Sequence, residues 1–271
     1  MISRILCPTD LSAVANNAAK YACQLGQITN ASVTLFHVRP EFATHVERSF
    51  EESPLNETRS MLEAQCKELA HSFEIRTEGE VDTGIRNFNN LIAHKGKAYD
   101  LLVVGSNGAD SVIQYLFGSN AFNISIKSKI PTFIIPESFD YKPVSRMIYA
   151  YDYKMHTAPP FAQLQMFQSL FGAKVTFLTI VEKYADEIEE QMELLQSKIL
   201  SRWKDPELIT FDYIYHPDVV SSLNHYYQMW SDHDLMVLSA RNHNFVEASF
   251  RTNVIKEISA IAAYPMLVIH S

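Results

Sequence analysis

The chain has 271 residues, a formal net charge of -8 at pH 7, 47% hydrophobic residues and 20% charged residues. This length suits two domains rather than one, and the composition is that of a globular protein that can form two cores. The negative charge argues against a nucleic-acid partner, and because no apolar run is long enough for a signal peptide or a membrane span, we expect no membrane partner either.

In the first half of the chain, short runs with strand character alternate with segments whose apolar residues recur at helical spacing. The expected strands are Ile5–Pro8, Val33–Val38, Glu74–Val81, Leu101–Gly105 and Thr132–Ile135, and the expected helices are Val14–Gln27, Glu57–Phe73, Asn87–Lys97 and Ser119–Ser128. The last two strands are apolar without alternation, as in strands that helices cover on both faces. A parallel sheet in a doubly wound α/β fold is therefore predicted.

The second half of the chain repeats the first. RILCPTD (Arg4–Asp10) returns as RMIYAYD (Arg146–Asp152) at an offset of 142, and YDLLVVGS (Tyr99–Ser106) returns as HDLMVLSA (His233–Ala240) at an offset of 134. The change of offset predicts eight extra residues in the first copy, which we place in the polar stretch Pro40–Asn56.

The repeat predicts the same strands in the second copy, at Met147–Ala150, Val175–Ile180, Thr210–Tyr215, Leu235–Leu238 and Met266–Ile269. Glu137–Ser145, which contains Pro143, is the expected linker. The predicted architecture is two tandem Rossmann-like domains, residues 1–138 and 146–271, each a five-stranded parallel sheet flanked by helices.

The three cysteines, Cys7, Cys23 and Cys66, lie far apart and form no CxxC pair. This usage favours a reduced, cytoplasmic setting. Cys7 lies in an apolar strand, where a small buried side chain is expected rather than a reactive thiol.

A glycine-rich segment follows the fourth expected strand, with Gly105, two residues, Gly108, nine residues and then Gly118–Ser119. Gly105 would turn the chain sharply at the carboxyl end of a strand, where open α/β sheets bind ligands. Gly108 would let the backbone approach a ligand, and Gly118–Ser119 would open a helix whose free N–H groups suit a phosphate. Such glycines also occur in turns without a ligand, but the strand before, the helix after and Asp10 at the end of the first strand favour a ligand site.

The spacing G-x2-G-x9-G-[ST] after DLLVVG, together with the start ILCPTDLS, resembles the universal stress protein family in its nucleotide-binding branch. The resemblance covers nearly the whole chain and implies an adenine nucleotide, ATP or else ADP or AMP. It implies that Asp10, with Pro8 and Thr9 beside it, holds the ribose or adenine side, and that Val38 meets the adenine through its backbone. The ribose and phosphates would be surrounded by Gly105, Ser106, Gly108, Gly118, Ser119 and Asn120.

One departure from the family concerns charge. The family often has a basic residue just after the second glycine, where this chain has Ala109 and Asp110. A carboxylate repels phosphate, so a bridging Mg²⁺ is expected with a triphosphate. The ten histidines lack the paired spacing of zinc sites, so no metal site made by protein side chains is expected.

The second copy loses the glycines. At the offset of 134, Ser239, Asn242 and Thr252 stand where the first copy has glycine, and Asn253 replaces the serine, although Asp152 keeps the aspartate. The prediction is therefore one nucleotide per chain, bound in the first copy. The second copy is either a structural partner or a site for a different ligand.

The expected function is that of a stress-response sensor or regulator that binds an adenine nucleotide. Two alternatives stay open: a binding module for another small or lipid-like ligand, marked by an apolar pocket in the second copy, and a slow ATP hydrolase. Rapid hydrolysis is not expected, because neither a nucleophile motif nor a Walker A lysine is present. The resemblance also implies that the copies pair through Thr132–Ile135 and Met266–Ile269 as a pseudo-dimer, while a homodimer of whole chains stays open.

Overall fold

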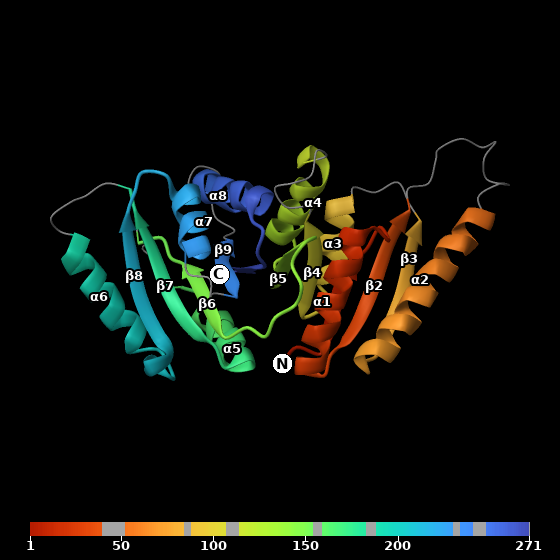
Figure 1. Ribbon diagram of the computed structural model, residues 1–271, viewed down its shortest axis with the longest axis horizontal. Coiled ribbons are helices and arrows are strands. Elements are labelled where there is room, and N and C mark those ends of the chain that lie inside the picture. The colour runs from red at the N-terminus through yellow and green to blue at the C-terminus, as the bar shows by residue number, and fades with distance from the viewer. Residues whose placement is uncertain are drawn as a thin grey trace. The chain divides into compact units, whose positions relative to one another are not determined.

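The computed structural model describes residues 1–39, 52–83, 88–106, 114–153, 159–182, 188–229, 234–240 and 248–270. The chain divides into two compact units, Met1–Tyr141 and Lys142–Ser271. Each unit is a parallel sheet with helices on both faces (Figure 1).

The first unit contains strands in the order β3-β2-β1-β4-β5, and all its neighbouring strands are parallel. Its strands are β1 Arg4–Pro8, β2 Ser32–Arg39, β3 Thr77–Thr83, β4 Leu101–Ser106 and β5 Thr132–Pro136. Its helices are α1 Ala13–Thr29, α2 Glu52–Phe73, α3 Phe88–Gly96 and α4 Gln114–Lys127.

The direction of the crossovers places the helices of this unit. Parallel crossovers are right-handed, so α1 and α2, which lead toward β3, cover one face, and α3 and α4, which lead toward β5, cover the other (Figure 1). The direction reverses between β1 and β4. Folds of this kind bind ligands at the carboxyl ends of the strands beside such a reversal.

The second unit repeats this order as β8-β7-β6-β9-β10, again parallel throughout. Its strands are β6 Arg146–Ala150, β7 Lys174–Val181, β8 Ile209–Tyr215, β9 Leu235–Ala240 and β10 Met266–His270. Its helices are α5 Phe161–Phe171, α6 Ile188–Leu200, α7 Val219–Met229 and α8 Ala248–Ile261, with a short 3-10 helix η2 at Pro206–Leu208. The predicted pair of five-stranded α/β units is thus confirmed.

The central strands form the core of each sheet. In the first unit, Leu101, Leu102 and Val103 of β4 have no exposed surface, as expected for a strand covered on both faces. The three cysteines are free and buried. Burial raises the pKa of Cys23 to about 12 and that of Cys66 to about 11, so these thiols stay protonated and unreactive at neutral pH.

Three predicted starts in the first unit are wrong by three residues or more. Helix α2 begins at Glu52 rather than Glu57, and α4 begins at Gln114 rather than Ser119. Strand β3 begins at Thr77 rather than Glu74, because Glu74 has a φ of 52°, a left-handed conformation that ends α2.

Strand register shows how the two copies differ in length. Val33 of β2 pairs with Thr77, and the corresponding Val175 of β7 pairs with Ile209, so β3 and β8 are offset by 132 rather than 142. The first copy therefore has ten extra residues between these strands and two fewer before β4. Helix α2 has 22 residues and α6 has 13, so the helix itself is longer in the first copy.

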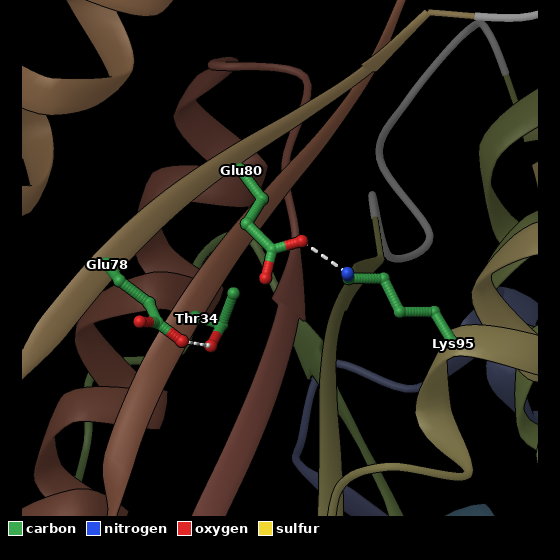
Figure 2. A network of polar contacts seen from close by, with 4 residues as sticks. All are labelled: Thr34, Glu78, Glu80 and Lys95. Atoms are coloured by element: carbon green, nitrogen blue, oxygen red, sulfur yellow. Dashed lines mark hydrogen bonds and ion pairs between the residues drawn. The ribbon is translucent and has the colours of Figure 1, made fainter.

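In each sheet a polar contact ties the third strand to the helix that follows it. In Figure 2, Thr34 donates a hydrogen bond to Glu78, at 2.9 Å, and Lys95 of α3 forms an ion pair with Glu80 of β3. At the offset of 132, Glu80 becomes Asp212, which accepts a hydrogen bond from Tyr226 of α7. Each strand is thus tied to the helix that follows it, with different chemistry in the two units.

Candidate functional site

The carboxyl ends of β1, β2 and β4 bring together six of the ten predicted ligand residues, which are Pro8, Thr9, Asp10, Val38, Gly105 and Ser106. These three strands are neighbours in the sheet, beside the reversal of the crossovers. Gly108 lies outside the described residues.

Hydrogen bonds hold the turn from β1 into α1. The backbone N–H of Thr9 donates to the carbonyl of Phe36, at 2.9 Å, which extends the pairing of β1 with β2. The Thr9 hydroxyl accepts from the N–H of Leu11, and the Asp10 carboxylate accepts from the N–H of Ser12, both at 3.0 Å. Asp10 itself is exposed. The turn is therefore ordered while its carboxylate faces solvent.

Leu11 adopts a φ of 66°, in the left-handed region that β-carbons disfavour. Ser12 then caps α1, because its hydroxyl accepts from the N–H of Ala15 at 3.3 Å. A strained non-glycine residue between two side-chain-to-backbone hydrogen bonds is typical of a functional turn.

Close packing against α1, rather than a sharp turn, explains why position 105 is a glycine. It lies inside β4, and a Cβ built on it would lie 2.7 Å from Val14 Cγ1 and 2.9 Å from the Val14 carbonyl oxygen. Real Cβ atoms do not approach backbone this closely, so α1 can pack here only against glycine. The expected role of Gly105 as a turn residue is corrected, because the chain continues in β4 to Ser106.

Ser106 is 1% exposed, and its hydroxyl has no hydrogen-bond partner among the described residues. A buried hydroxyl without a partner costs about 1–3 kcal/mol, so such a group in a native protein requires an explanation. Ser106 is the last residue of β4, at the end of the sheet where ligands of this fold bind. A bound ligand with a polar atom would supply the missing partner.

The last three of the predicted ligand residues lie in helix α4, and this changes their expected role. Gly118, Ser119 and Asn120 lie within the helix, which starts at Gln114. The free N–H groups of a helix belong to its first four residues, so Gly118 and Ser119 do not open it as expected. The residues before Gly118 include good helix formers, and they extend the helix past the position that glycine suggested.

The second unit has other residues at the corresponding positions. Ser239 takes the place of Gly105, and its hydroxyl accepts a hydrogen bond from Tyr149 at 3.3 Å. Ala240 takes the place of Ser106. Thr252 and Asn253 lie in α8, and Asn242 lies outside the described residues.

Two residues that shape the candidate site were not found by the sequence analysis. The Nδ1 atom of His37 lies 2.9 Å from the carbonyl oxygen of Thr9. Val14 lies so close to position 105 that only glycine fits there. The adjacency of His37 to Val38 was the one available signal, while the contact between Val14 and Gly105 joins residues far apart in the sequence.

Among the described residues, no group of three or more His, Cys, Asp or Glu side chains is arranged to bind a metal ion. No helix in the described part of the chain combines the length and the apolar character that crossing a membrane requires.

Residues 1–136 match the model of the Universal stress protein family. The chain belongs to the universal stress protein family. No curated protein sequence matches it.

Two solved structures show the same fold over nearly the whole chain. A universal stress protein from Archaeoglobus fulgidus DSM 4304 has 14% identity and a TM-score of 0.74, with 98% of each chain covered. A putative universal stress protein from Pseudomonas aeruginosa UCBPP-PA14 has 11% identity and a TM-score of 0.63, covering 99% of this chain and 93% of that one. A universal stress protein in complex with cAMP matches 51% of this chain and 99% of its own, at 19% identity and a TM-score of 0.41.

Proposed function

We propose that this universal stress protein binds an adenine nucleotide at the carboxyl ends of β1, β2 and β4 in its first unit, and that it acts as a sensor or regulator. The family supports a stress-related role, and the resemblance to its nucleotide-binding branch, which the glycine spacing carries, supports ATP, ADP or AMP as the ligand.

The unpartnered hydroxyl of Ser106 carries the proposal. It is buried at the end of β4, in the strand that precedes the glycine-rich segment. A ribose hydroxyl or a phosphate oxygen would satisfy it. The second unit, where we propose that no nucleotide binds, has Ala240 there and leaves no hydroxyl to satisfy.

The turn that follows β1 would hold the other side of the ligand. The Asp10 carboxylate is exposed and is oriented by the N–H of Ser12, so it can accept hydrogen bonds from ribose hydroxyls. The Thr9 turn and the backbone of Val38 would border the base.

Mg²⁺ would enter with a triphosphate, since it is usually held by one or two carboxylates together with phosphate oxygens. Asp110, the carboxylate beside which this ion is expected, lies outside the described residues. We propose a cytoplasmic setting, which the three free and buried cysteines support.

The pairing of the two copies through β5 and β10 remains a prediction, which rests on the resemblance and on the cost of open sheet edges. Hydrogen exchange of the full chain tests it. Protection of successive N–H groups from Thr132 to Ile135 supports pairing, and fast exchange of alternate ones contradicts it.

Mass spectrometry of the ligand released from freshly purified protein tests the nucleotide directly. The expected ligand is ATP, ADP or AMP, and added ATP should raise the melting temperature. If no nucleotide is released and ATP leaves the melting temperature unchanged, the proposal fails. A single-turnover assay then separates a sensor from a hydrolase, since phosphate release well above the rate without protein would favour the enzyme.

Ser106→Ala is the sharpest variant. We expect ATP affinity to fall about 3- to 10-fold, the value of one hydrogen bond, while the unliganded protein becomes no less stable because an unsatisfied hydroxyl is removed. Isothermal titration calorimetry and urea unfolding measure the two effects.

Ser259→Ala is the matched control. It also removes a buried hydroxyl, but one that donates to the carbonyl of Ile255, at 2.5 Å, within α8. It should change stability and leave ATP affinity unchanged. A purely structural Ser106 would behave in the same way, and that result would remove it from the site.

A further inference from the structure

The segment Glu137–Tyr141, which we call the strap, follows β5 in the sequence and contacts the first unit at both of its ends. The N–H of Glu137 donates to the carbonyl of Ser106, at 3.0 Å, and so continues the pairing of β4 with β5. At the other end, the ring of Tyr141 meets the ring of Tyr21 in α1 edge to face, with 5.1 Å between the centroids. The strap thus belongs to the first unit, which ends at Tyr141.

A side chain of α1 holds the middle of this segment. Asn17 Nδ2 donates to the carbonyl oxygens of Pro136 and Phe139, each at 2.9 Å. Because a carbonyl oxygen can only accept, both bonds come from the amide nitrogen and use its two N–H groups. Asparagine is a poor helix former in the interior of a helix, so its contact with the strap, rather than the helix itself, accounts for its place in α1.

The two elements that hold the strap also border the proposed nucleotide site. Helix α1 follows the turn that contains Asp10, and Ser106 ends β4. The carbonyl of Ser106 accepts from the strap, while its buried hydroxyl has no partner among the described residues. A ligand bound to this hydroxyl would restrain the residue whose carbonyl holds the strap. Ordering one group in this way lowers the entropy cost of ordering its neighbour.

The strap also sets the length of the tether between the two units. The first anchor of the chain in the second unit is at Ser145, whose N–H donates to the carboxylate of Asp234 at 2.7 Å. While the strap is held, residues 142–144 connect the anchors, and once it is released the connection is residues 137–144. The effective concentration of one domain beside another depends on the length of such a tether.

We propose that the strap is the output of the nucleotide site. Bound nucleotide holds Glu137–Tyr141 against α1 and β4, and without nucleotide the strap is released more readily, which lengthens the tether to the second unit. Asn17 is the positioning residue of this coupling. This inference rests on the proposed function, because it takes a nucleotide at Ser106 as the input. The coupling is reciprocal, so release of the strap weakens nucleotide binding by the factor by which nucleotide suppresses release.

Hydrogen exchange of the full chain, with and without saturating ATP, tests the coupling. The reporters are the N–H groups of Glu137 and Phe139, which donate to the carbonyls of Ser106 and Pro136. We expect ATP to slow their exchange at least about 5-fold. If the parent protein binds no ATP, the proposed function fails and this proposal fails with it. If ATP binds and both exchange rates stay unchanged, this proposal fails alone.

Asn17→Ala removes both hydrogen bonds of the amide. Alanine is the better helix former, so the substitution does not weaken α1 itself. We expect exchange at Glu137 and Phe139 to become about 10-fold faster without nucleotide, and ATP affinity measured by calorimetry to fall about 3- to 10-fold. Faster exchange with unchanged ATP affinity would mark Asn17 as a purely structural contact and overturn the proposal. The comparison of the parent with and without ATP is decisive even if this variant does not fold.

Gln163→Ala is the matched control in the second unit. His270 corresponds to Pro136, and its carbonyl accepts from Gln163 Nε2 at 2.8 Å while its N–H donates to Gln163 Oε1 at 3.1 Å. This variant also removes a side-chain amide that holds the end of a fifth strand. Exchange in the strap and ATP affinity should both stay unchanged. If Gln163→Ala changes them as much as Asn17→Ala does, the coupling is not specific to the strap and the proposal is wrong.

Discussion

Gly105 and Ser239 occupy the same position of the repeat, but their surroundings differ: one leaves no room for a side chain and the other accommodates one. In the first unit, Val14 leaves no room for a Cβ at Gly105. In the second unit, the Ser239 hydroxyl accepts a hydrogen bond from Tyr149 and lines a cavity. The loss of this glycine thus accompanies a change in how the helix sits on the sheet, in addition to any effect on a ligand.

Gly105→Ala tests the packing role without any ligand. The new Cβ would lie 2.9 Å from the Val14 carbonyl oxygen, and backbone cannot yield as a flexible side chain does. We expect the free energy of unfolding of the first unit to fall by about 1–3 kcal/mol in urea titrations. Ser239→Ala is the control and should cost less than about 1 kcal/mol. A Gly105→Ala protein as stable as the parent would contradict the packing account.

The convergence of Thr9, Asp10 and Val38 at one end of the sheet follows from the sequence, because parallel strands end on the same side. The demand for glycine at position 105 does not, since it depends on how closely α1 approaches β4. The contact between His37 and Thr9 likewise needs the register of β1 with β2.

At the scale of elements, one carboxylate fastens the first strand of each unit. Asp100 Oδ2 accepts from Ser3 N and Ser3 Oγ, both at 2.8 Å, and from Arg4 N at 3.0 Å. Asp234 Oδ2 accepts from Ser145 N, Ser145 Oγ and Arg146 N at 2.7, 2.8 and 3.0 Å. In each unit the residue before the fourth strand thus fixes the start of the first.

This anchor predicts acid sensitivity in the first unit. Partial burial acts to raise the pKa of Asp100, but the hydrogen bonds from Ser3 and Arg4 and the N-terminal charge outweigh it and lower the pKa. The stabilisation is therefore present above the unfolded pKa of about 3.9 and is lost as pH falls through the lower folded value. Asp100→Asn should lower stability by about 1 kcal/mol at pH 7 and flatten its decline below about pH 4.

Urea unfolding between pH 2.5 and 7 measures this effect. Ser3→Ala is the graded control: it removes one of the three donors and should cost less than Asp100→Asn. An Asp100→Asn protein with an acid limb as steep as that of the parent would contradict the role of this carboxylate.

Most elements and their order could be predicted, because both apolar runs and helical periodicity recur in the two copies. The boundaries that failed have local causes. Glycine at position 118 suggested a helix start, but the residues from Gln114 already form the helix. The left-handed Glu74 carries no signal in its residue type, since glycine or asparagine usually takes that conformation.

For the whole molecule, the repeat gives two units of one fold whose corresponding sites differ in chemistry. The first unit leaves a buried hydroxyl unsatisfied at Ser106, and the second has Ala240 there and a cavity lined by two carboxylates. The central claim is that one adenine nucleotide binds per chain, in the first unit.

Calorimetric titration of nucleotide-free protein with ATP tests this claim most directly, using the parent, Ser106→Ala and Asp152→Asn. We predict one ATP per chain, an affinity lowered about 3- to 10-fold by Ser106→Ala and an affinity unchanged by Asp152→Asn. Two ATP molecules per chain, or an affinity that changes with Asp152→Asn and not with Ser106→Ala, would contradict the account.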